Sequence, residues 1–73
     1  MRLPALKPKK VIKVLKIIGF RQVRQTGSHL ILVNKITKRI ISVPIHSKDI
    51  KRGLLFSIIK QADLTIEEFI RLL

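Results

Sequence analysis

The chain has 73 residues, of which 16 are Lys or Arg and 4 are Asp or Glu, so its formal net charge is +12 at pH 7. This length allows one small domain and excludes a two-lobed cleft or a dinucleotide-binding fold. Without cysteine the chain cannot form disulfides, thiolate nucleophiles or Cys-ligated zinc sites, and its two histidines and four scattered acidic residues disfavour a metal site with three ligands.

Residues 9–18 have the periodicity of an amphipathic helix. Pro8 suits the first turn, where its missing N–H has no intrahelical partner, and Gly19 is placed to end the helix. At 100° per residue the apolar side chains gather on one side of this helix and the lysines on the other. The apolar side consists of Val11, Val14, Leu15 and Ile18, and the cationic side of Lys9, Lys13 and Lys16.

Three short extended segments follow the helix, at residues 20–25, 29–33 and 39–43. Thr26-Gly27-Ser28 forms a tight turn between the first two segments. Pro44 closes the third segment, because proline cannot continue a central strand. Connections this short predict an antiparallel meander of three strands.

A second amphipathic helix follows the loop that begins at Pro44. We expect Ser47 or Asp49 to cap this helix, because short polar side chains accept hydrogen bonds from the first free N–H groups. Its core-facing stripe repeats at i, i+3, i+4 and i+7. The stripe consists of Leu55, Ile58, Ile59 and Ala62.

The last residues predict a third, short helix. Thr65 and Glu68 have the spacing of a capping box, in which each side chain bonds to the other residue's backbone N–H. The apolar face of this helix consists of Ile66, Phe69, Ile70 and Leu73. The order α-β-β-β-α-α, with helices on one face of an antiparallel sheet, predicts a single α+β domain over residues 1–73.

The basic excess predicts a polyanionic partner, because it exceeds the charge of about 2–8 that suffices for solubility of a small domain. Nucleic-acid phosphate is the commonest such partner, since binding it releases condensed counterions. A membrane surface is disfavoured, because the fold needs the face opposite the lysines for its core. An acidic protein is the alternative. The candidate phosphate contacts, nearest in sequence to the Gly-Ser-His turn, are Lys9, Lys13, Lys16, Arg21 and Arg24.

His29 is the candidate catalytic residue, with Ser28 and His46 as candidate auxiliary residues. Imidazole titrates near pH 6.5, so it can take and return protons at neutral pH. RNA carries its own nucleophile, the 2′-OH, so one positioned base and cationic phosphate contacts can suffice without a metal ion. The alternative is that His29 is a hydrogen-bonded structural residue and that His46 is a loop residue that only titrates.

Several short motifs occur in an order and spacing that resemble those of HicA-type toxins, over about residues 9–69. These toxins are small mRNA interferases of bacterial and archaeal toxin–antitoxin modules. The motifs that carry the resemblance are Gly19-Phe20, Gln25-Thr26-Gly27-Ser28-His29, Val43-Pro44-x-His46, Lys48-Asp49-Ile50, Gly53-Leu54 and Ile58-Ile59-Lys60-Gln61-Ala62.

The resemblance implies a fold similar to double-stranded-RNA-binding domains and a metal-independent endoribonuclease activity. It implies that His29 is the catalytic histidine and that Gly27 and Ser28 form the turn that presents it. Two positions depart from the family's pattern: Asp63 stands where a glycine is usual, and Leu54 where a threonine is common.

The implied partners are an mRNA substrate and a HicB-type antitoxin, with DNA contacted only through the antitoxin. We expect a cytoplasmic protein without a cofactor, because the sequence has no phosphate-binding glycine motif, no signal peptide and no membrane span. Two other functions stay open, a non-catalytic RNA-binding module of the same fold and a protein-binding adaptor.

Overall fold

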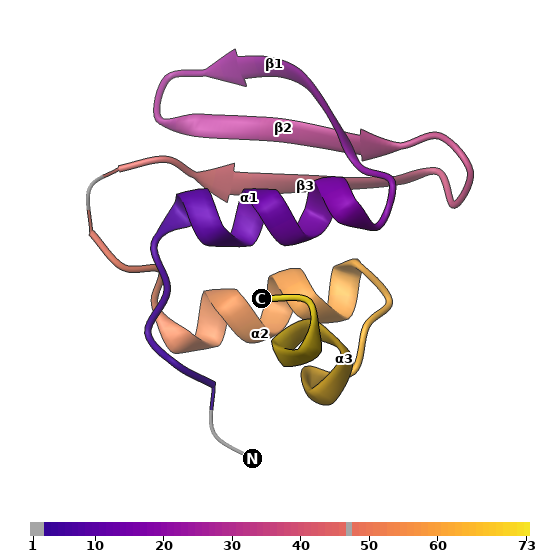
Figure 1. The fold of residues 1–73 in the computed structure, drawn as a ribbon. Coiled ribbons are helices and arrows are strands. Elements are labelled where there is room, and N and C mark those ends of the chain that lie inside the picture. The colour runs from indigo at the N-terminus through magenta and orange to yellow at the C-terminus, as the bar shows by residue number, and fades with distance from the viewer. Residues whose placement is uncertain (1–2, 47) are drawn as a thin grey trace.

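The computed structural model describes residues 3–46 and 48–73. They form three strands and three helices joined by loops (Figure 1). Strand β2 lies between β1 and β3 and is antiparallel to both. Helices α1 and α2 contact β3, and α3 contacts α2. The predicted α+β order is therefore confirmed. The bounds are α1 Pro8–Ile17, β1 Arg21–Thr26, β2 His29–Asn34, β3 Arg39–Pro44, α2 Arg52–Gln61 and α3 Ile66–Arg71.

The core lies between the helices and the inner face of β2 and β3. The strands alternate as their two-residue period requires, with Leu30, Leu32, Ile41 and Val43 buried. The helices contribute the stripes that periodicity predicted. Their buried members are Val11, Val14, Leu15, Leu55, Ile58, Ile59, Ala62 and Phe69, while Ile18, Ile66 and Ile70 are partly buried and Leu73 is exposed.

The segment before α1 also belongs to the core, which the sequence did not indicate. Leu3 and Leu6 are buried, although prolines interrupt any periodic pattern around them. The carbonyl oxygen of Leu6 accepts a hydrogen bond of 2.8 Å from the N–H of Ile50, which is itself buried. This contact ties the start of the chain to the segment that precedes α2.

The start of α2 differs from the prediction. Its N-cap residue is Lys51, whose side chain makes no capping hydrogen bond, so the prediction that Asp49 caps the helix is wrong. Ser47 lies outside the described residues. The hydrogen bond from Ile50 to Leu6 holds the chain out of helical conformation past Asp49, and the helix begins only after it.

Helix α1 ends as predicted, at a glycine in the left-handed region. Gly19 has a φ of +103°, and its N–H donates to the carbonyl of Lys16 (3.2 Å). The N–H of Phe20 donates to the carbonyl of Leu15 (3.0 Å). These two bonds are those of a Schellman motif, which satisfies the last free carbonyls of a helix.

Helix α2 ends in the same motif with an aspartate in place of the glycine. Asp63 has a φ of +62° and donates its N–H to the carbonyl of Lys60 (3.0 Å). The N–H of Leu64 donates to the carbonyl of Ile59 (3.2 Å). The resemblance described above leads one to expect glycine at this position, and the backbone conformation here is one that glycine adopts most easily.

Candidate functional site

His29 is the first residue of β2 and directly follows a two-residue turn formed by Gly27 and Ser28. Gly27 has a φ of +56°, a conformation that glycine adopts without the steric cost of a Cβ atom. A positive φ at the first of two turn residues is typical of a type II′ turn, whose twist matches that of the flanking strands. The side chain of Gln25 donates to the carbonyl of Gly27 (3.1 Å). The turn therefore presents His29 at the closed end of the β1–β2 hairpin, whose pairing is interrupted further along, between Gln22 and Arg24.

The outer face of the sheet, which is the face away from the helices, carries His29. The residues that alternate with it along β2 are buried on the inner face, so His29 shares the outer face with Ile31 and Val33. Its partners on the neighbouring strands are Thr26 of β1 and Pro44 of β3. Directly paired residues have Cβ atoms about 4.5–5.5 Å apart, so these two flank His29 closely.

Arg24 is the predicted phosphate contact that the register brings to His29. It pairs with Ile31, one step along the outer face, and is therefore diagonal to His29. Diagonal neighbours lie about 7–8 Å apart, within reach of a long side chain. Both side chains are exposed. An imidazole and a guanidinium thus share an open surface.

His46 lies in the loop after β3, close to the turn but on the side of α1. The N–H of Ile45 donates to the carbonyl of Ser28 (2.6 Å), so the loop continues beside the hairpin turn. His46 and Ile45 line a shallow concavity together with Lys9 and Ile12 of α1. The structure therefore brings His46 to a lysine of α1, and the residue before it, Ile45, is bonded to the backbone of Ser28.

The predicted cations do not form one cluster. Lys9, Lys13 and Lys16 lie on the exposed side of α1, as periodicity predicted, and this helix packs on the opposite face of the sheet from Arg24. Lys16 lines a concavity together with Arg21, where α1 meets the start of β1. The cations are thus spread from the outer sheet face around to α1.

Two neighbours of His29 were missed by the sequence reasoning. The sequence predicted Thr26 as part of the turn, but the structure makes it the last residue of β1, so the turn has only two residues and Thr26 pairs with His29. Pro44 depends on how β3 aligns with β2, and no single turn reveals that alignment. Lys7 is another missed cation: its ammonium lies 3.9 Å from the Asp49 carboxylate, and both side chains are exposed.

Every residue from Arg21 to His29 is exposed, and this segment carries two arginines and no acidic residue. Within the described residues, no group of three or more His, Cys, Asp or Glu side chains is arranged to hold a metal ion. Across the same residues, no helix has the length and apolar character needed to cross a bilayer.

The fold and the site define a small basic α+β domain with a histidine presented by a hairpin turn on an open sheet face. Residues 8–64 match the family of the HicA toxin of bacterial toxin–antitoxin systems. The match covers most of the 73 residues, so the chain belongs to the HicA toxin family. It is therefore a toxin of this kind, and the partner of such a toxin is an antitoxin. No curated protein matches the chain.

Proposed function

We propose that this toxin is an endoribonuclease that cleaves mRNA, with His29 as the general acid–base and arginine and lysine side chains holding phosphate. The observation that carries the proposal is the pairing register, which sets His29 and Arg24 diagonally on one exposed face. An open face of this kind admits a polymer strand, whereas a small substrate requires an enclosing pocket. A HicB-type antitoxin is the proposed protein partner, and the cytoplasm, where mRNA is translated, is the proposed location.

The proposed reaction uses the nucleophile that RNA supplies. His29 takes the proton of a 2′-OH, and the 2′-oxygen forms a bond to the adjacent phosphorus. The bond from phosphorus to the 5′-oxygen breaks, and this oxygen receives a proton from a protonated imidazole. The products are a 2′,3′-cyclic phosphate and a 5′-hydroxyl. Arg24 stabilises the negative charge that develops on the phosphoryl oxygens.

His46 and Ser28 are proposed auxiliary residues. His46 can supply the proton for the leaving oxygen, because the loop that carries it follows Ile45, which is bonded to the turn. Ser28 contributes its carbonyl to that bond, so its backbone positions the loop relative to His29. The role of His46 requires its imidazole near the scissile phosphate, and the hydrogen bond between Ile45 and Ser28 supports this by holding the loop beside the turn.

The test is cleavage of a mixed-sequence RNA by purified His29→Ala. We expect a loss of about 10²–10⁴-fold in rate, as is usual when one general acid–base group is removed. His46→Ala tests the proposed auxiliary role and should also lower the rate, and circular dichroism checks that both variants fold. Unchanged cleavage by His29→Ala would refute the assignment. A wild-type protein that shifts RNA in a gel while leaving it intact would instead establish a non-catalytic RNA-binding module.

A further inference from the structure

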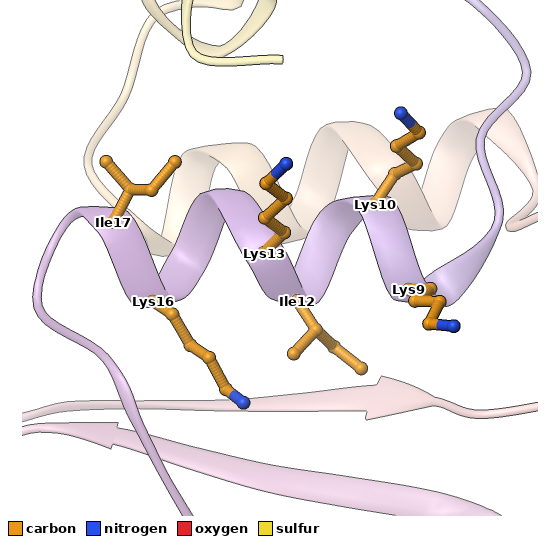
Figure 2. A pocket seen from close by; sticks show the side chains of 6 residues that line it. All are labelled: Lys9, Lys10, Ile12, Lys13, Lys16 and Ile17. Carbon is orange, nitrogen blue, oxygen red and sulfur yellow. The ribbon is translucent and has the colours of Figure 1, made fainter.

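Three shallow concavities adjoin along α1 and form one continuous surface, which we name the α1 groove. The central concavity has a volume of about 700 Å³ and is formed only by side chains of the helix (Figure 2). At one end a second concavity shares Lys9 with it and extends to His46. At the other end a third shares Lys16 and extends to Arg21. The central lining consists of Lys9, Lys10, Ile12, Lys13, Lys16 and Ile17.

The α1 groove is cationic along its whole length. Its central part is lined by four lysines, Lys7 lies at one end, and Arg21 lies at the other. Among the described residues, no carboxylate lines any of the three concavities. The nearest ion pair is at the Lys7 end, where the ammonium lies 3.9 Å from the exposed carboxylate of Asp49.

One row of α1 side chains connects the two ends of the groove. Figure 2 shows Lys9, Ile12 and Lys16 on the side of the helix nearer the strands, and Lys10, Lys13 and Ile17 on the other side. Lys9 and Lys16 are seven residues apart, which corresponds to about 10 Å along the helix axis. The row therefore forms a track of charge from His46 past the helix to Arg21.

We infer that the α1 groove binds the RNA strand that flanks the cleaved phosphate, so that the toxin engages an extended single strand of several nucleotides. This inference rests on the proposed function. One end of the groove lies beside the proposed site, because the loop that carries His46 is bonded to Ser28. The groove leads away from there along α1 to Arg21, at the opposite end of β1 from the turn. Regularly spaced cations suit a phosphate backbone, and the half-buried Ile12 offers an apolar surface to a nucleobase.

The test measures binding without cleavage, by fluorescence anisotropy of 2′-O-methyl RNA, in which the nucleophile is blocked. The variant is Lys9→Gln with Lys16→Gln, and a 20-nucleotide strand is compared with a 4-nucleotide strand. Each single-strand phosphate contact contributes about 0.7 to the slope of log K against log salt. Two lost contacts should lower this slope by about 1.4 and weaken binding of the long strand about tenfold at 0.15 M salt. Binding of the short strand, which cannot occupy the groove and the His29 turn together, should change less.

The control is Lys35→Gln with Lys60→Gln, which removes the same charge outside the groove. An equal loss in this control would show that only net charge matters and would overturn the inference. Retained RNA affinity with lost affinity for a HicB-type antitoxin would make the groove a protein interface and would also overturn it. The binding test can fail or succeed independently of the proposed function. If the protein binds RNA in the groove but cleaves no RNA, the catalytic proposal is refuted and the groove inference stands.

Discussion

Asp63 and Gly19 occupy the same place in two helix ends, and only one of them has a Cβ atom. Both follow the C-cap residue of a helix, and both have a positive φ, +62° for Asp63 and +103° for Gly19. A side chain in the left-handed region costs about 1–2 kcal/mol for an ordinary residue, although aspartate tolerates it better than most. Asp63 is therefore a local weakness in a small domain.

Replacing Asp63 with glycine should stabilise the protein. The relief of backbone strain exceeds the extra entropy of glycine in the unfolded chain, so we expect a gain of about 0.5–1 kcal/mol and a rise of a few degrees in Tm. Thermal unfolding followed by circular dichroism measures this change. Asp63→Ala keeps the Cβ atom and is the control, for which no gain is expected. A Tm of Asp63→Gly at or below the wild-type value would contradict the argument.

Asn34 shows how one buried polar residue connects separate parts of the fold. Its side-chain amide donates to the carbonyl of Ile18 (3.3 Å), at the end of α1. Its side-chain oxygen accepts from the N–H groups of Ile36 (3.0 Å) and Thr37 (3.2 Å), in the loop between β2 and β3. The end of α1 is thus fixed to the sheet by a residue that Gly19 approaches closely.

At the scale of secondary structure, Gly19, which follows the end of α1, and Gly53, which lies in α2, should respond to alanine in opposite directions. A Cβ atom on Gly19 would lie 3.3 Å from the amide nitrogen of Asn34, in addition to its unfavourable φ. We expect Gly19→Ala to lower the free energy of unfolding by about 1–2 kcal/mol.

Gly53 is the matched control, because it lies in α2 and a Cβ atom there would meet nothing within 4 Å. Gly53→Ala should raise the free energy of unfolding by about 0.5–1 kcal/mol through helix propensity. Urea unfolding of both variants tests the pair. Equal effects of the two substitutions would show that neither contact nor φ governs these positions.

The capping box of α3, which the spacing of Thr65 and Glu68 predicted, is confirmed and has a pH signature. The Glu68 carboxylate accepts from the Thr65 N–H (2.9 Å), and the Thr65 hydroxyl accepts from the Glu68 N–H (3.1 Å). The hydrogen bond from the Thr65 backbone, and then that from its side chain, lowers the pKa of Glu68 below its ordinary value.

A lowered folded-state pKa stabilises the fold above the unfolded pKa, and this contribution is lost as pH falls through the folded pKa. We therefore expect Tm to fall as pH drops below about 4.3, the ordinary range of a glutamate. The contribution of the Glu68 carboxylate is isolated by comparing the drop in Tm from pH 6 to pH 3 in the wild type with that in Glu68→Gln. The variant should show a smaller drop, and an identical drop would assign the acid sensitivity to other carboxylates.

At the scale of the whole molecule, the net charge of +12 opposes folding. The Debye length at 10 mM salt is about 30 Å, which is comparable to the longest dimension of the molecule, 32 Å. All cations therefore repel one another at low salt. We expect Tm to rise when NaCl is increased from about 10 to 300 mM, since the Debye length then falls below 10 Å.

Calorimetry over this range of salt measures the effect. The double substitution of Lys35 and Lys60 by glutamine lowers the net charge by two and should reduce the salt dependence. A Tm that falls with added NaCl would show that specific ion pairs, rather than general repulsion, dominate. A bound antitoxin or RNA should stabilise the domain further by mass action, by about 2.7 kcal/mol at a hundredfold excess over Kd.

Features that depend on neighbours in the sequence could be predicted, and features that depend on packing could not. The apolar stripes, the Gly19 helix end and the capping box all follow from spacing within one element. The burial of Leu3 and Leu6 and the late start of α2 arise from a contact between residues 44 positions apart, Leu6 and Ile50. The candidate site divides in the same way.

Within the site, the pairing of His29 with Thr26 and the position of Arg24 follow from a two-residue turn. The approach of His46 to Lys9 requires knowing how α1 packs beside the end of β3. Sequence proximity therefore grouped five cations that the fold distributes over two sides of the molecule. The α1 groove connects the lysines of α1 with Arg21, and this connection depends on the packing of α1 beside the sheet.

The exposure of β1 separates the function of this toxin from its foldability. No side chain of Arg21–Thr26 is buried, and neither Gly27, Ser28 nor His29 contributes to the core. On the proposed function, a substitution of His29 removes toxicity while the hydrophobic core stays intact. A single change can therefore separate loss of toxicity from loss of folding.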